Sequence, residues 1–155
     1  MSTPPRHFYF AGELFDHKHL IGNRGIAETL ERLSGGAWQM LLPQQRESGD
    51  RRGVEIRNLD FEWLFEADAV VMNFDGPDLD SGTVVEFAYA KMLDIPAVLL
   101  RTDFRSAGDQ GADGAPWNLM CAGYPRSRSV ALNAMTLYHR HAGDNFPASY
   151  LQAIA

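Results

Sequence analysis

Four carboxylates gather in the middle of the chain, where an apolar run gives way to a predicted helix. The stretch 75–90 reads DGPDLDSGTVVEFAYA and supplies Asp75, Asp78, Asp80 and Glu86. Like charges at this spacing repel one another, and folding alone gives no reason to gather them. Neighbouring carboxylates can divide two tasks, nucleophilic attack by an ionised group and proton transfer by a protonated one. The cluster therefore marks a candidate catalytic site.

The same residues also admit a purely structural interpretation. Thr83 and Glu86 have the spacing of a capping box, in which hydroxyl and carboxylate satisfy free amides at a helix start. Aspartates beside glycine and proline are ordinary turn formers. Capping and catalysis both stay open for Glu86, whereas so dense a cluster between two apolar elements favours a site.

Alternating strands and helices are predicted to position this cluster. Apolar runs predict strands at residues 7–12, 38–42, 68–74, 96–101 and 129–132. Helices are predicted over residues 16–33, 54–66 and 83–93, with a short one within 133–138 and a last piece ending at Ala155. This alternation predicts a single α/β domain over residues 1–155, a flavodoxin-like, doubly wound, five-stranded parallel sheet of order 2-1-3-4-5 with helices on both faces. Ligands of such sheets bind at the carboxyl ends of the strands, where the acidic cluster lies.

Composition limits the partners of the protein. The chain has 155 residues, 45% of them hydrophobic, and a net charge of −6, which disfavours nucleic acid and acidic membranes as partners. One cysteine, Cys121, fits a reducing compartment, and no apolar run approaches the length of a membrane span. We therefore expect a soluble, cytoplasmic protein.

Several motif classes are missing from the chain. It contains no G-x-G-x-x-G, no G-x-x-x-x-G-K-[ST] and no G-x-S-x-G, which disfavours dinucleotide, P-loop and α/β-hydrolase sites. The pairs His17/His19 and His139/His141 lie in polar segments without a matched third ligand, so no metal is expected. No cofactor is expected either.

Four separate pieces of the chain resemble the nucleoside 2-deoxyribosyltransferases. They are the opening strand with Tyr9-Phe-Ala-Gly12, the helix-borne aspartate Asp60, the element Asp80-Ser-Gly-Thr-Val-Val-Glu86, and Asn118 ahead of Leu-Met. Their order and spacing agree with the family over most of the chain. The resemblance implies base exchange on 2′-deoxyribonucleosides, with free purine or pyrimidine bases as the second substrate.

The resemblance also implies roles for individual residues. Glu86 would be the nucleophile, forming a covalent 2-deoxyribosyl ester, and Tyr9 would orient it. Asp60 and Asp80 would bind substrate, one of them passing a proton to the departing base. Asn118 would reach the sugar 5′-hydroxyl in a neighbouring subunit's site, which implies a homo-oligomer. A helix N-terminus is expected to keep Glu86 ionised, while acidic neighbours raise the pKa of the most crowded carboxyl.

Further substrate contacts are expected from Gly12, Phe15, Asp75 and Gly82. The glycine-rich loop 102–117 is a candidate flap over the site, with Trp117 and the aromatic residues near the first strand excluding water. Two features depart from family patterns: the chain ends Gln-Ala-Ile-Ala155 rather than in tyrosine, and residues 13–17 differ, which leaves the preferred base open.

Two other functions stay open. A hydrolase of the same fold would cleave nucleosides or nucleotides with water as acceptor, and a phosphate site would need serines and an arginine. Only Ser81 and, less directly, Arg24 are offered, which favours nucleosides. A non-catalytic nucleotide-binding module is the third possibility, disfavoured by the retained Glu86 and its two aspartates.

Overall fold

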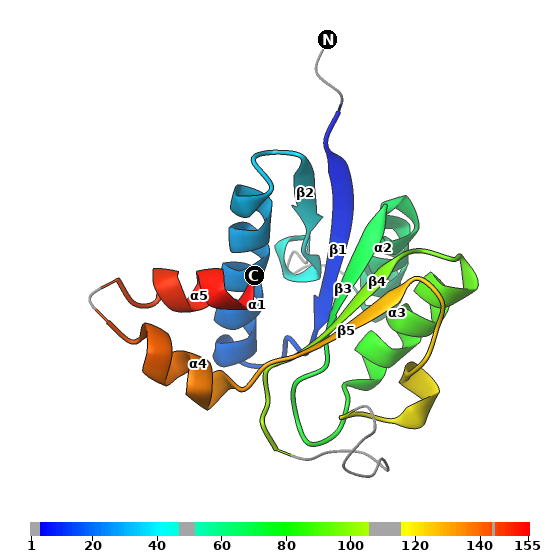
Figure 1. Ribbon diagram of the computed structural model, residues 1–155. Coiled ribbons are helices and arrows are strands. Elements are labelled where there is room, and N and C mark those ends of the chain that lie inside the picture. The colour runs from blue at the N-terminus through cyan, green and yellow to red at the C-terminus, as the bar shows by residue number, and fades with distance from the viewer. Residues whose placement is uncertain (1–3, 47–51, 106–115, 144) are drawn as a thin grey trace.

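A five-stranded parallel sheet forms the centre of the molecule (Figure 1). The computed structural model describes residues 4–46, 52–105, 116–143 and 145–155. The strands are β1 (Arg6–Gly12), β2 (Trp38–Leu41), β3 (Ala69–Asn73), β4 (Ala97–Arg101) and β5 (Ser127–Ala131). Their spatial order, β2-β1-β3-β4-β5, confirms the predicted flavodoxin-like arrangement.

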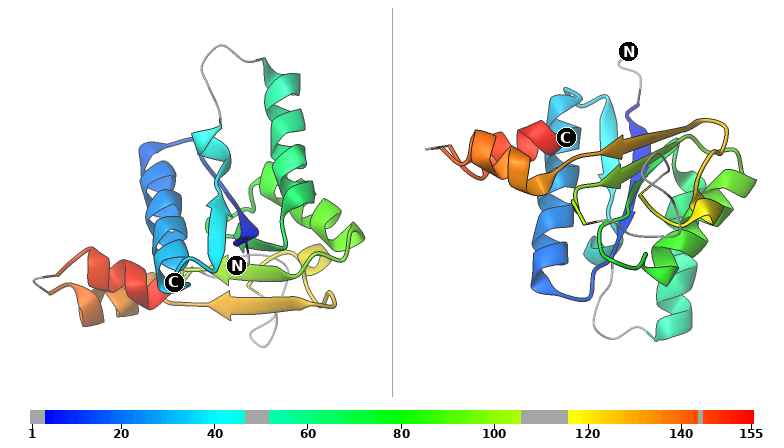
Figure 2. Two further views of the ribbon diagram at one scale, coloured as in Figure 1. Left: turned by 90° about the horizontal axis from the view of Figure 1, so that it is seen from above. Right: turned by 60° about the horizontal axis from the view of Figure 1, so that its bottom comes forward.

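Helices cover both faces of the sheet, as predicted (Figure 2). The helices are α1 (His17–Leu33), α2 (Gly53–Glu66), α3 (Ser81–Met92), α4 (Ala134–His141) and α5 (Ala148–Ile154), with short 3-10 turns at Pro43–Gln45 and Leu119–Cys121. Helices α2 and α3 lie on one side of the sheet, and α1 lies on the other with α5 and α4 beside it. No helix in the described part of the chain is long and apolar enough to cross a membrane.

The alternation of side chains along β1 connects the two halves of the core. Phe8 and Phe10 are buried on the α1 side with Ile26 and Leu100, whereas Tyr9 and Ala11 are buried on the side of α2 and α3. Successive residues of a strand point to opposite faces. This period-two pattern directs the Tyr9 side chain toward α3.

Several predicted element ends shift by about two residues. Helix α3 begins at Ser81 rather than Thr83, because Asp80 is its N-cap. Strand β5 begins at Ser127 rather than Ser129, and α4 extends to His141. The shift at α3 matters most, since it changes the position of Glu86 along the helix.

Candidate active site

Asp80 sets the start of α3 and thereby the place of Glu86. Its Oδ2 accepts hydrogen bonds from the Thr83 amide (2.8 Å) and from the Thr83 hydroxyl (2.9 Å). Side-chain acceptors at the N-cap satisfy amides that the helix leaves free. The capping-box interpretation of Thr83 and Glu86 is therefore wrong. Glu86 lies in the second turn, too far along α3 for the helix N-terminus to keep it ionised, which corrects that expectation.

Tyr9 and Glu86 make the central contact of the site. The Tyr9 hydroxyl donates a 2.6 Å hydrogen bond to Glu86 Oε1. Tyr9 is fully buried within β1, at 0% exposure, and Glu86 is half-buried on α3. Because both backbones belong to packed elements, the carboxylate is held in one orientation.

Two adjoining cavities open beside Glu86. The first, about 200 Å³, is lined by Gly12, Leu14, Phe15, Pro43, Asp60, Asp80, Gly82, Thr83 and Glu86. The second, about 320 Å³, is lined by Arg57, Asp60, Phe61, Ser81, Gly82, Val85 and Glu86. Asp60, Gly82 and Glu86 line both. The structure thus brings six of the nine predicted site residues around one hollow, with Tyr9 behind Glu86.

Gly12, which lines the smaller cavity, has no side chain and so leaves space for Asn73 of β3 and Asn23 of α1. A Cβ at Gly12 would lie 3.0 Å from Asn73 Cβ and 3.3 Å from Asn23 Nδ2. These two asparagines are buried, and Asn73 Nδ2 donates to Asn23 Oδ1 (3.1 Å). Asn23 Nδ2 in turn donates to the Glu13 carbonyl (2.9 Å). Gly12 therefore permits a polar contact that holds the loop carrying Phe15.

The electrostatic environment acts mainly on Glu86. Burial raises the pKa of its carboxyl to about 7; the Tyr9 hydrogen bond opposes this rise, and the charges of Asp60 and Asp80 add to it. Removing a carboxylate from water disfavours its charged form, as do like charges nearby. The most crowded carboxyl of the cluster is thus Glu86 itself. A raised pKa makes it a stronger base and nucleophile once ionised.

Asp75, for which a substrate contact was expected, lines neither of the two Glu86 cavities. Its Oδ1 accepts hydrogen bonds from the backbone amides of Thr102 (2.5 Å) and Asp103 (2.8 Å). Its Oδ2 accepts from the Thr102 hydroxyl (2.6 Å). Three donors from the chain after β4 therefore occupy this carboxylate.

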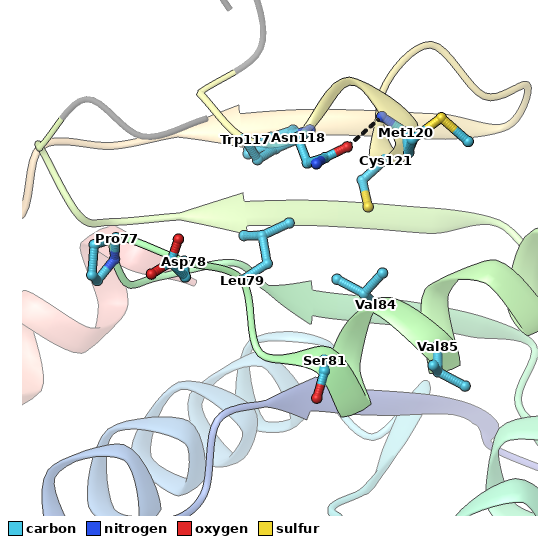
Figure 3. A pocket seen from close by; sticks show the side chains of 10 residues that line it. All are labelled: Pro77, Asp78, Leu79, Ser81, Val84, Val85, Trp117, Asn118, Met120 and Cys121. Atoms are coloured by element: carbon cyan, nitrogen blue, oxygen red, sulfur yellow. Dashed lines mark hydrogen bonds between the residues drawn. The ribbon is translucent and has the colours of Figure 1, made fainter. Parts of the chain in front are cut away.

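Asn118 lines a different cavity, of about 560 Å³, together with Leu79, Val84 and Cys121 (Figure 3). Its Oδ1 accepts a hydrogen bond from the Met120 amide (2.8 Å), and the residue is exposed. The two Glu86 cavities do not include Asn118. Within one chain, Asn118 and Glu86 are thus not brought into the same hollow.

Of the aromatic residues expected to exclude water from the site, some lie in the core and one lies at the edge of a Glu86 cavity. Phe10 and Trp117 are buried at 1% exposure, and Trp117 packs edge-on against Phe74 with ring centroids 5.6 Å apart. Phe15 is 76% exposed on the rim of the smaller cavity. Of the candidate flap 102–117, residues 106–115 lie outside the described residues.

Arg57 and Ser81 line the larger of the two Glu86 cavities, and neither was predicted to contact a nucleoside. Arg57 lies one helical turn before Asp60 on α2, so the two share a face of the helix. In the sequence, only this spacing from Asp60 indicates that Arg57 lies near the site. Across the described ranges, no group of three or more His, Cys, Asp or Glu residues could hold a metal ion.

The sequence and the fold are similar to those of known proteins. Residues 8–120 match the family model described as nucleoside 2-deoxyribosyltransferase. Among solved structures, a conserved protein from Enterococcus faecalis V583 is 27% identical with a TM-score of 0.68, covering 82% of this chain and 91% of that one. A 2-desoxiribosyltransferase from Leishmania mexicana is 22% identical with a TM-score of 0.61, covering 77% of this chain and 87% of that one.

A 2-deoxyribosyltransferase from Bacillus psychrosaccharolyticus is 17% identical, with a TM-score of 0.52 and coverage of 64% of this chain and 74% of that one. These last two likenesses concern the fold alone. No curated protein matches the chain. The family model, however, spans well over half of the sequence and includes Tyr9, Asp60, Asp80, Glu86 and Asn118. The chain therefore belongs to the nucleoside 2-deoxyribosyltransferase family.

Proposed function

We propose that this protein exchanges the base of 2′-deoxyribonucleosides through a 2-deoxyribosyl ester on Glu86. The observation that carries the proposal is the 2.6 Å hydrogen bond from the buried Tyr9 to Glu86, on the wall of a hollow shared with Asp60 and Asp80. In this proposal Tyr9 holds Oε1, and the second oxygen of Glu86, Oε2, makes the attack. Residues 1–155 would act as one catalytic domain.

In the first step, Glu86 attacks the anomeric carbon of the sugar. The C–N bond to the base breaks as the new C–O ester bond forms, and the bond electrons leave with the base. The base accepts a proton from a neighbouring carboxyl group, for which we assign Asp60. Asp60 lines both Glu86 cavities, whereas Asp80 lines only the smaller one and its Oδ2 caps α3.

In the second step, a nitrogen of the incoming base attacks the same carbon from the opposite side. The ester C–O bond breaks, Glu86 is released as a carboxylate, and the proton lost by the incoming base returns to Asp60. Two displacements retain the configuration of the sugar. Tyr9 stabilises the carboxylate in the free enzyme and as it leaves.

The walls of the hollow suit the two halves of the substrate. Leu14, Phe15 and Pro43 line the smaller cavity and offer apolar surface for a flat base. The shared wall of Gly82 and Glu86 would face the sugar. An exposed aromatic such as Phe15 can cover the base and keep water from the ester.

Base exchange tests this function directly. The protein is incubated with deoxyinosine and adenine, and deoxyadenosine is followed by chromatography. We expect deoxyadenosine to form with the wild type and a loss of about 1,000-fold or more with Glu86→Gln. Mass spectrometry of protein quenched without acceptor should show a 2-deoxyribosyl adduct on the peptide containing Glu86.

The same assay examines the rival function. A hydrolase of this fold would release free deoxyribose at a rate that does not depend on the concentration of adenine. Deoxyribose as the only sugar product would contradict the transferase proposal. Glu55→Gln, an exposed change near the start of α2, provides a control that should keep full activity.

A further inference from the structure

Outside the two Glu86 cavities, the Asp75 carboxylate joins the acidic loop to the chain after β4. It accepts three hydrogen bonds, two at 2.5 and 2.8 Å from the Thr102 and Asp103 amides and one at 2.6 Å from the Thr102 hydroxyl. Hydrogen bonds to an ionised acceptor are the strong ones in proteins. The end of β3 is thus fastened to the end of β4 beyond the last pair of the sheet.

Arg101, the last residue of β4, makes contacts in the opposite direction. Its Nη1 donates to the Phe74 carbonyl (2.6 Å) and its Nη2 to the Gly76 carbonyl (3.0 Å), the two residues that flank Asp75. Asp75 binds the amides that follow Arg101, and Arg101 binds the carbonyls on either side of Asp75. We call these reciprocal contacts the Asp75–Arg101 clamp.

Arg101 is a buried cation that donates hydrogen bonds to three backbone carbonyls, those of Phe74, Gly76 and Arg105 (3.2 Å). The side chain is 1% exposed, and its Nε has no hydrogen-bond partner within the described structure. Replacing a buried charge by a well-packed apolar residue is often neutral or stabilising, so the charge itself is weak evidence for a stability role. Its five donors in a fixed fork can, however, fix two carbonyls at once.

The clamped segment leads directly to the reacting group. Gly76 has a φ of +108°, and its carbonyl is the one that Arg101 Nη2 holds. Four residues later, Asp80 caps α3 and lines the smaller cavity beside Glu86. The clamp therefore fixes one end of a short loop, and the cap of α3 fixes the other.

We propose that Asp75 and Arg101 are positioning residues that hold Asp80 and the start of α3 in the geometry that the reaction needs. The inference rests on the proposed role of Glu86. Neither side chain touches substrate. A loosened clamp lets Asp80 withdraw and lets water reach Glu86, so the effect on catalysis exceeds the effect on folding.

The experiment uses substitutions that weaken the clamp without removing the buried cation. Thr102→Val removes the hydroxyl that donates to Asp75, and Thr102→Ser keeps it. Asp75→Asn replaces one acceptor oxygen by a donor that faces backbone amides. Asp94→Asn is the matched control, because Asp94 is an exposed aspartate bonded to Arg126 at the surface (2.7 Å).

Thr102→Val and Asp75→Asn are expected to lower kcat by about 10- to 100-fold with KM within about threefold of wild type. The acidic limb of the pH–rate profile should move to lower pH, because both burial and the Asp80 charge raise the pKa of Glu86. Thr102→Ser and Asp94→Asn should keep the wild-type kcat and profile.

Hydrogen exchange of the Thr83 amide, measured by NMR, tests the clamp without any assay of activity. This amide donates to Asp80, and it should exchange about tenfold faster in Thr102→Val and Asp75→Asn. Wild-type exchange at Thr83 together with a wild-type kcat in both variants would overturn the proposal, even if thermal melts shift. Faster exchange in a protein that shows no base exchange at all would support the clamp and reject the role of Glu86.

Discussion

The Tyr9 hydroxyl and Glu86 Oε1 lie 2.6 Å apart, although 77 residues separate them in the sequence. The contact joins the middle of β1 to the second turn of α3 across the face of the sheet. Burial disfavours the charged form of Glu86, and the phenolic donor stabilises it. The pair thus holds a carboxylate that is both reactive and fixed in direction.

Tyr9→Phe is expected to lower kcat about 10- to 100-fold. The loss corresponds to one hydrogen bond to a charged group, about 1.5–3 kcal/mol. Without the donor, the pKa of Glu86 rises further, so the acidic limb of the rate profile should move to higher pH. Steady-state kinetics from pH 5 to 9 measure both effects. Tyr138→Phe, at an exposed tyrosine of α4, should change neither; a wild-type profile for Tyr9→Phe would show that the contact is only structural.

In the wild type, kcat/KM should fall as the pH drops below about 7. Glu86 must be ionised to attack, and the pKa of its carboxyl is raised from 4.5 to about 7 by burial first, and then by the Asp60 and Asp80 charges. Below that value the rate should fall about tenfold per pH unit. An acidic limb near the ordinary value of 4.5 would show that substrate meets a solvated carboxylate instead.

The same pKa makes a prediction about folding stability. The folded state binds the Glu86 proton more tightly than the unfolded chain, so this contribution is fully present below pH 4.5 and is lost as the pH rises through about 7. A glutamine does not ionise, so the Glu86→Gln variant does not lose this stability as the pH rises. The variant should unfold at a free energy about 1–3 kcal/mol above wild type at pH 8 and close to wild type at pH 4.5, as urea titrations can measure. Equal stabilities at pH 8 would indicate that Glu86 is not desolvated.

Substrates with different leaving groups distinguish the roles of Asp60 and Asp80. Asp60→Asn should slow exchange from deoxyinosine about 100-fold, but should slow it much less with 7-methyl-2′-deoxyguanosine, whose base leaves without protonation. Asp80→Asn keeps an acceptor for Thr83 and should affect both substrates alike. The opposite pattern would assign the proton to Asp80. Rates of base release by chromatography distinguish the two outcomes.

The sheet order and the Glu86 hollow were accessible from the sequence for a physical reason. Apolar runs alternate with helical patterns, and right-handed crossovers leave few ways to connect them. Carboxyl ends of parallel strands meet at one edge, so the loop that ends at Asp80 and the end of β1 at Gly12 had to be neighbours.

What the sequence could not provide was the choice between competing local contacts. Asp80 and Thr83 are both good helix caps, and only the packed position of Thr83, which is buried, selects Asp80. Asp75 was expected to contact the substrate because its hydrogen-bond partners lie 27 and 28 residues further along the chain, where no local sequence pattern indicates them. Arg57 resembled an ordinary charge on a solvated helix face.

Asn118 lies outside the Glu86 cavities of its own chain, and the neighbouring Leu119 and Met120 are 59% and 75% exposed. Apolar side chains gathered on a surface are typical of an interface. We therefore expect a homo-oligomer in which Asn118 completes the site of a second copy, and light scattering should show no active monomer.

Subunit mixing tests whether Asn118 acts across that interface. Glu86→Gln and Asn118→Ala proteins should each be nearly inactive, and each hybrid pair would contain one site with both residues intact. For a twofold dimer, equal mixing after unfolding and refolding should restore roughly a quarter of the wild-type rate. Asn133→Ala is the matched control, because Asn133 caps α4 through Thr136 as Asn118 caps its turn through Met120. If the mixture stays inactive while Asn118→Ala alone remains impaired, Asn118 acts within its own chain.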